Sequence, residues 1–77
     1  MNMIYKDDTL FVDLVGVVGY KEVNMMKQRL FSVLDQYEVD NVVVNVRKAF
    51  KINRNVMNSF VNDYHKNYSG NLLIDNK

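Results

Sequence analysis

Asn41-Val42-Val43-Val44-Asn45-Val46 carries the strongest indication of the fold. Its β-branched side chains favour an extended backbone, and apolar residues lie on both sides of the strand that this backbone makes. A strand that is apolar on both sides and lies between two helical segments is typical of the interior of a parallel sheet. We therefore expect residues 41–46 to form an interior strand of an α/β domain.

Helical segments flank this strand on both sides. Between Lys21 and Tyr37, apolar residues recur at the spacing of one buried helix face. They are Val23, Met26, Leu30, Val33, Leu34 and Tyr37. Met25 and Phe31 fall outside this stripe, which indicates either a wide buried face with scattered exposure or a contact with a partner.

Residues 54–68 carry the second helical pattern, with one apolar and one polar face. The expected inward residues are Val56, Met57, Phe60, Val61, Tyr64 and Tyr68. Ser69-Gly70 follows, and glycine commonly ends a helix in the left-handed backbone conformation. We expect Gly70 to adopt that conformation.

Strands are expected near both ends of the chain as well. Residues 3–6 and 9–15 predict two strands, and Asp7-Asp8 between them indicates a tight hairpin, although the favoured Asp-Gly pair is absent. Residues 71–75 predict a last strand. The element order is then ββαβαβ with right-handed crossovers, which predicts a single α/β domain over residues 1–77 with a mixed four-stranded sheet and two helices.

The composition excludes several classes of function. The chain has no cysteine, which removes disulfides, thiolate metal sites and a cysteine nucleophile, and its one histidine cannot build a histidine metal cage. A net charge of +1 gives no broad electrostatic footprint for nucleic acid. No apolar run is long enough to span a bilayer, and the first residues lack the order of a signal peptide. We expect a cytoplasmic protein with no metal, no cofactor and no membrane span, for which nucleic acid is an unfavoured partner.

Catalytic residues are not brought together by any pattern in the sequence. His65 lies on the polar face of the second helix, where Asp63 falls on a different side, and no serine has a glycine elbow. No pair of carboxylates is evidently held in an apolar pocket. We expect a surface histidine and a protein that is not an enzyme.

Four short blocks, together with the element order, resemble the STAS domain. This is the fold of bacterial anti-sigma-factor antagonists and of the cytoplasmic tail of sulphate transporters. The blocks are Thr9–Gly16, Val42–Val46, Phe50–Met57 and Ser69–Ile74. The resemblance covers roughly residues 9–76, and it implies a protein-interaction and regulatory function. Family members usually continue beyond the strand at 71–75, so the chain resembles a domain that is short at its carboxyl end.

The block at 50–57 departs from the family in one chemical respect. In the antagonists it contains Asp-Ser-Ser-Gly, whose second serine is phosphorylated by the anti-sigma kinase. Asn53, Arg54, Asn55 and Val56 stand at those positions here, and an asparagine amide has no hydroxyl to phosphorylate. The resemblance thus implies binding to a regulatory kinase or an anti-sigma-like factor without this switch. The implied partner-binding residues are Asn53, Arg54, Asn55, Asn58, Ser59 and Asn62.

A basic loop supports an alternative function. Arg47, Lys48, Lys51 and Arg54 place four cations in eight residues between the carboxyl end of a strand and the start of a helix. Open α/β sheets bind ligands there, and free helix N–H groups favour anions. The alternative is an anion- or nucleotide-binding module, whereas a solvated basic loop and a helix cap at Asn53 or Asn55 explain the same residues without a ligand.

A homodimer is predicted from burial. If both helices lie on one side of the sheet, the side chains that face away from them are Phe11, Val15, Val43 and Leu73. A chain of this length has no further element to cover that side, and small domains often gain stability by association. We therefore expect these residues to form a dimer face.

Overall fold

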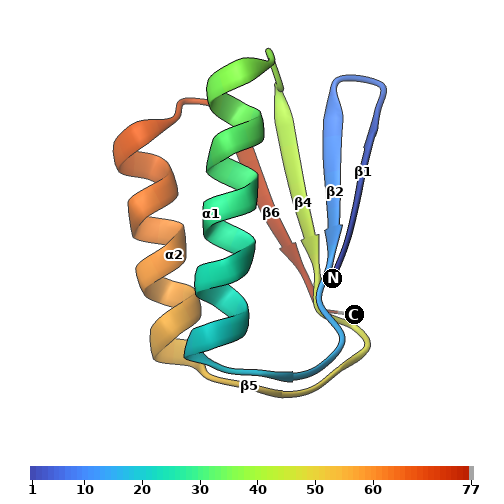
Figure 1. Ribbon diagram of the computed structural model, residues 1–77, viewed down its shortest axis with the longest axis vertical. Coiled ribbons are helices and arrows are strands. Elements are labelled where there is room, and N and C mark those ends of the chain that lie inside the picture. Colours follow the sequence, from blue (N-terminus) through green and yellow to red (C-terminus); the bar gives the residue numbers. More distant parts are fainter. Residues whose placement is uncertain (77) are drawn as a thin grey trace.

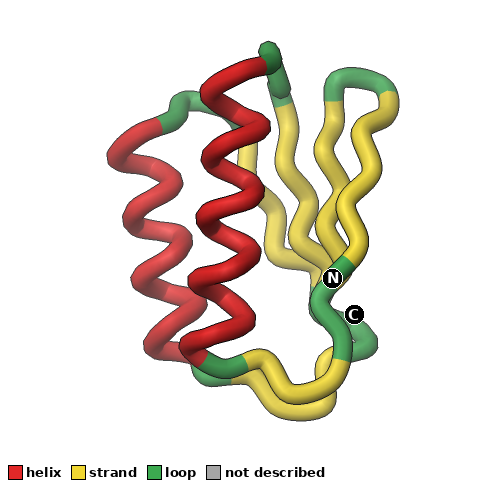
Figure 2. Tube along the Cα trace, in the orientation of Figure 1, coloured by secondary structure: helices red, strands yellow, loops and turns green. Residues whose placement is uncertain are grey.

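A four-stranded sheet with two helices on one side forms the body of the computed structural model, which describes residues 1–76 (Figures 1 and 2). The elements are β1 (Asn2–Lys6), β2 (Thr9–Asp13), β3 (Gly16–Val18), α1 (Tyr20–Gln36), β4 (Asn41–Asn45), β5 (Ala49–Ile52), α2 (Arg54–Asn67) and β6 (Asn71–Asp75). The α/β class, the two helices and the mixed four-stranded sheet agree with the prediction. Within the described part of the chain, no helix is long and apolar enough to cross a membrane.

The strand order is β1-β2-β4-β6. β1 runs antiparallel to β2, whereas β2, β4 and β6 are parallel to one another. β4 is therefore an interior strand, as its valine run predicts. The hairpin between β1 and β2 is also confirmed: Asp7 and Asp8 have φ values of 52° and 59°, the pair of positive angles that a type I′ turn requires.

A second, two-stranded sheet was missed by the sequence prediction. β3 and β5 pair in parallel below the main sheet (Figure 1). The strand expected over 9–15 ends at Asp13, and Gly16, with φ +78°, redirects the chain into β3. Gly16 pairs with Ala49 and Val17 with Lys51, so Phe50 is left over as a bulge and is 87% exposed.

The helices begin at well-formed caps. The Gly19 amide donates to Glu22 Oε1 at 3.0 Å at the start of α1, and this hydrogen bond lowers the pKa of Glu22. At the start of α2, the Val56 amide donates to Asn53 Oδ1 at 3.2 Å. Asn53 therefore caps the helix, and it is one of the two residues, Asn53 and Asn55, that the sequence offers for this role.

The prediction of a left-handed Gly70 was wrong. Gly16 is the glycine that has positive φ in the described chain, and Gly70 serves a different purpose. A Cβ atom on Gly70 would lie 2.9 Å from the Asp40 carbonyl oxygen and 3.0 Å from Tyr64 Oη. Glycine is thus required because β6 enters the sheet in close contact with the loop before β4.

The core lies between the helices and one face of the sheet. Both helical stripes supply it, and no polar or charged side chain of residues 1–76 is fully buried. The buried residues of this core are Leu10, Val12, Leu14, Val18, Val42, Val44, Val46, Val23, Met26, Leu30, Met57, Phe60 and Tyr64. Tyr37, which was predicted to face inward, follows the end of α1 and is 65% exposed. Phe31 packs on Tyr68 with ring centroids 4.9 Å apart, whereas Met25 is 46% exposed.

Candidate functional site

The outer side of α2 carries the residues that the resemblance nominates for partner binding. Asn53 caps the helix, and the other five residues are exposed on its first turns. We call these five the α2 surface: Arg54, Asn55, Asn58, Ser59 and Asn62. The surface is a ridge between two hollows, since Asn55 and Ser59 border one and Arg54 and Asn58 border the other.

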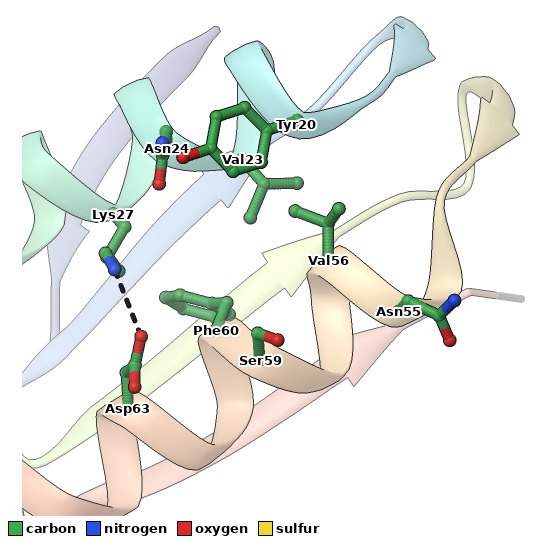
Figure 3. A pocket seen from close by; sticks show the side chains of 9 residues that line it. All are labelled: Tyr20, Val23, Asn24, Lys27, Asn55, Val56, Ser59, Phe60 and Asp63. Atoms are coloured by element: carbon green, nitrogen blue, oxygen red, sulfur yellow. Dashed lines mark hydrogen bonds and ion pairs between the residues drawn. The ribbon is translucent and has the colours of Figure 1, made fainter.

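The first hollow is a groove between α1 and α2, with a volume of about 290 Å³. Val23 of α1 and Val56 of α2 point toward one another across it, and Phe60 lies deeper along the same groove (Figure 3). Asn55 and Ser59 form its polar rim on the α2 side. The groove thus combines an apolar floor with a polar edge.

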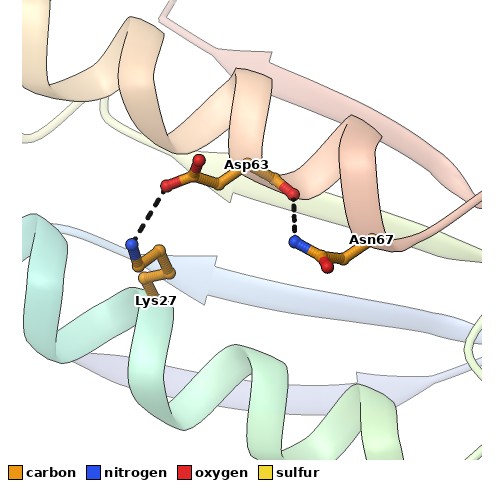
Figure 4. A network of polar contacts seen from close by, with 3 residues as sticks. All are labelled: Lys27, Asp63 and Asn67. Carbon is orange, nitrogen blue, oxygen red and sulfur yellow. Dashed lines mark hydrogen bonds and ion pairs between the residues drawn. The ribbon is translucent and has the colours of Figure 1, made fainter.

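An ion pair joins the two helices at one end of this groove. Lys27 Nζ lies 3.0 Å from Asp63 Oδ2, and the Asp63 carbonyl accepts a hydrogen bond of 2.8 Å from Asn67 Nδ2 (Figure 4). The two charged side chains are 30% and 40% exposed, so the pair contributes little to stability. It connects the walls of the groove across the helix interface.

Tyr20 lines the other end of the groove and is 68% exposed. Exposed tyrosines next to an apolar floor are frequent anchors in protein interfaces, because the ring offers contact area and the hydroxyl a hydrogen bond. The sequence prediction missed the α1 side of the groove. Tyr20, Asn24 and Lys27 recur at i, i+4 and i+7, a second stripe on α1 that was a usable signal.

The predicted basic residues divide between two places. Arg47 Nε donates to Asn45 Oδ1 at 3.1 Å and lies 3.7 Å from Asp75 Oδ2, at the ends of β4 and β6. Lys51 and Arg54 line the second hollow, of about 440 Å³, between β5, α2 and the end of β6. Lys48 is exposed but is not part of that lining.

We call the second hollow the basic corner. Lys51, Arg54 and the bulged Phe50 border it. Its apolar lining residues are Val46, Ala49, Ile52, Met57, Val61 and Ile74. A cationic rim over an apolar floor suits an anion that also has an apolar part.

The uncovered face of the main sheet is the third surface. Its middle is one row of side chains in register across the four strands, Ile4, Phe11, Val43 and Leu73. Ile4, Phe11 and Leu73 are 53%, 42% and 58% exposed. The structure thus brings together three of the four predicted dimer-face residues and adds Ile4, which only the hairpin register could identify.

Val15 belongs to a different environment. It lies after the end of β2, is 61% exposed, and borders a hollow of about 260 Å³ together with Leu14, Val18 and Met25. The row on the uncovered face therefore excludes it.

Metal ligands do not converge on these surfaces in the described part of the chain. In residues 1–76, no group of three or more His, Asp or Glu side chains could hold a metal ion. His65 is exposed, and its ring packs edge-on against Tyr64 with centroids 5.5 Å apart.

No family model matches the sequence, and no curated protein matches it significantly. Its function is therefore inferred from the surfaces described above.

Proposed function

We propose that this chain is a cytoplasmic, non-enzymatic protein-binding domain of the STAS type. It acts in regulation by binding another protein, as the bacterial anti-sigma-factor antagonists do, but without their phosphorylation switch. The observation that supports this proposal is the groove between α1 and α2, whose rim contains Asn55 and Ser59, two of the residues that the resemblance nominates.

The groove has the anatomy of a small protein interface. Its floor is formed by Val23, Val56 and Phe60, and its rim offers amide and hydroxyl groups that both donate and accept hydrogen bonds. Tyr20 supplies an exposed aromatic anchor at one end. A site of this size favours a weak, reversible complex, which suits regulation.

Asn55 makes the binding independent of a kinase. It occupies the position of the phosphorylated serine in the family and is exposed on the first turn of α2. A negative charge there is compatible with the helix, because carboxylates are favourable near a helix N-terminus. An aspartate at position 55 would therefore imitate the phosphorylated state without weakening the fold.

Site-specific photo-crosslinking in the native host tests the proposal. A photoreactive amino acid at position 59 is expected to capture a protein that the same amino acid at the exposed Gln28 does not capture. Asn55→Asp and Tyr20→Ala should each reduce this capture about tenfold, the effect of losing one interface anchor. Gln28→Glu, the matched charge control, should leave it unchanged. Identical captured proteins at positions 59 and 28 would contradict the proposal.

A second candidate function is anion binding at the basic corner. It is favoured by Lys51 and Arg54, which border a hollow whose floor is apolar. Calorimetric titration with ATP, GTP and inorganic phosphate tests it, and Lys51→Glu should abolish any binding while Lys66→Glu, at the other end of α2, should not. Arg54→Glu weakens either kind of binding, whereas Ser59→Arg affects only a protein partner. No heat with any of the three anions removes this candidate.

A further inference from the structure

We propose that the uncovered face of the main sheet binds a second copy of this chain, with the strands of the two stacked sheets running in opposite directions. This interface lies on the side of the sheet away from the helices, so it is separate from the groove proposed for a different protein (Figure 1). The proposal rests on the pattern of side chains along the three rows of that face.

The middle row is apolar from one edge of the sheet to the other. Ile4 pairs with Phe11, Phe11 with Val43, and Val43 with Leu73, so their side chains project on the same side. Three of these side chains, Ile4, Phe11 and Leu73, are between 42% and 58% exposed. An uninterrupted apolar row is self-complementary, because two copies can stack it on itself.

The row nearer the β1–β2 hairpin is polar and carries one positive charge. It consists of Lys6, Thr9, Asn41 and Asn71 in register. Asn71 Nδ2 donates to Asn41 Oδ1 at 3.0 Å, and Asn41 Nδ2 donates to Thr9 Oγ1 at 3.5 Å. These bonds order the amides into a ladder. We call this the hairpin row.

The row at the other end of the face is acidic. It consists of Asn2, Asp13, Asn45 and Asp75 in register. Arg47 lies 3.7 Å from Asp75 and so offsets one of the two carboxylates. The other carboxylate, that of Asp13, lies on β2, next to β1. We call the row of Asn2, Asp13, Asn45 and Asp75 the acidic row.

A twofold axis along the apolar row matches these charges. It places each strand over its own copy in the reverse direction, so the hairpin row of one molecule lies over the acidic row of the other. Lys6 then lies over Asn2 of the other copy and one strand away from its Asp13, a step of about 4.8 Å that a lysine side chain spans. The symmetry produces two such Lys6–Asp13 pairs.

The other face-to-face arrangement is less favourable. A twofold axis along the strands would stack the acidic row on itself, which gathers the carboxylates of Asp13 and Asp75 from both copies in one layer. It would also keep Lys6 with the polar hairpin row of the partner, away from the partner's Asp13. Like charges brought together at an interface oppose association. The charge pattern therefore selects the arrangement with opposite strand directions.

The size of the face sets the strength of the dimer. Four strands at about 4.8 Å spacing and five residues at about 3.4 Å rise give a flat footprint of roughly 300 Å². This is below the roughly 800 Å² per partner of a standard stable interface. The dimer is consequently weak and forms in the micromolar range or above.

Sedimentation equilibrium over about 10–500 µM, a range suited to a weak complex, tests the proposal. The wild-type chain should show a monomer–dimer equilibrium. Leu73→Lys places a charge in the apolar row and should abolish it, whereas Val17→Lys, an equally exposed site on β3, should not. Lys6→Glu and Asp13→Lys should each weaken association about tenfold, because each change affects two symmetry-related pairs. The double variant with both changes should restore it.

Each other result overturns a stated part of the proposal. A monomer at every concentration, or a dimer that tolerates Leu73→Lys, excludes this face as a self-association surface. Loss with Leu73→Lys without recovery in the double variant excludes the opposite strand directions. Circular dichroism of every variant confirms that the exposed substitutions leave the fold intact. Loss of the dimer leaves photo-crosslinking at position 59 unaffected, so the two proposals fail independently.

Discussion

The two faces of the main sheet are built from the same strands, yet they differ in burial. On the helix side, Leu10 and Val44 are 2% and 0% exposed; on the other side, Phe11 and Leu73 are 42% and 58% exposed. The uncovered face has one apolar row between two polar rows, whereas the strands are apolar along the helix side. An apolar row therefore stays uncovered because the path of the chain places both helices on the other side.

The direction of the crossovers explains this asymmetry. The chain passes from β2 to β4 through α1 and from β4 to β6 through α2, always toward the same edge of the sheet. Right-handed crossovers that progress in one direction place their helices on one face. A reversal of direction would have placed one helix on each face and covered the apolar row that contains Phe11 and Leu73.

The largest difference between the two faces is expected in the free energy of unfolding, when one side chain of β2 is truncated on each face. Leu10→Ala removes a buried side chain under the helices and should lower the free energy of unfolding by about 3 kcal/mol, the usual cost of a core cavity. Phe11→Ala, one residue along, should cost about 1 kcal/mol because its ring is already 42% exposed. Urea denaturation at a concentration where the chain is monomeric measures both. Equal losses would show that both faces are packed to the same degree.

A smaller effect is expected where the helix layer meets the end of the sheet. Gly70→Ala would bring Cβ within 2.9 Å of the Asp40 carbonyl oxygen, which must shift and weaken the start of β6. We expect a loss of about 1–3 kcal/mol, as for overpacking in a core. Gly19→Ala is the matched control, because its Cβ would meet only Glu22 Oε1 at 3.4 Å. A loss at Gly70 no larger than at Gly19 would contradict the close approach seen here.

The smallest effect concerns pH and the contact between the helices. Burial, followed by a hydrogen bond of 2.6 Å to Asp35, raises the pKa of Tyr68 to about 12 from 10.0. Between about pH 10 and pH 12, the folded chain therefore keeps the Tyr68 hydroxyl proton, whereas the unfolded chain loses it. The stability that Tyr68 contributes is complete below about pH 10 and declines as the pH rises toward 12.

Chemical denaturation of the wild type and Tyr68→Phe across this range tests the assignment. The two stabilities should differ by about 1 kcal/mol at neutral pH, the worth of a typical hydrogen bond, and should converge at high pH. The difference between the curves isolates Tyr68, since burial also raises the pKa of Tyr64. Parallel curves up to pH 12 would show that the Tyr68 hydroxyl is not held in this way.

The candidate sites were only partly predictable. The sequence of residues 54–68 is enough to predict the polar face of α2. The resemblance to the STAS domain also places Asn55 and Ser59 at a partner surface without any knowledge of the groove. Tyr20 and Lys27 complete that groove from another helix, which local periodicity cannot reveal. The four cations at 47–54 were expected together, but Arg47 turns toward Asp75 while Lys51 and Arg54 remain at the basic corner. Sequence spacing does not specify which way a loop side chain points.

Local sequence is enough to predict the helices, the interior position of β4 and the tight hairpin, because side-chain periodicity and turn chemistry act between neighbours along the chain. The pairing of β3 with β5 cannot be predicted in this way, since residues 16–18 and 49–52 lie far apart in sequence and each is too short to show a pattern. The same holds for the bulge that exposes Phe50 and for the close approach at Gly70. These features depend on contacts between distant segments, whose geometry exists only once the chain has folded.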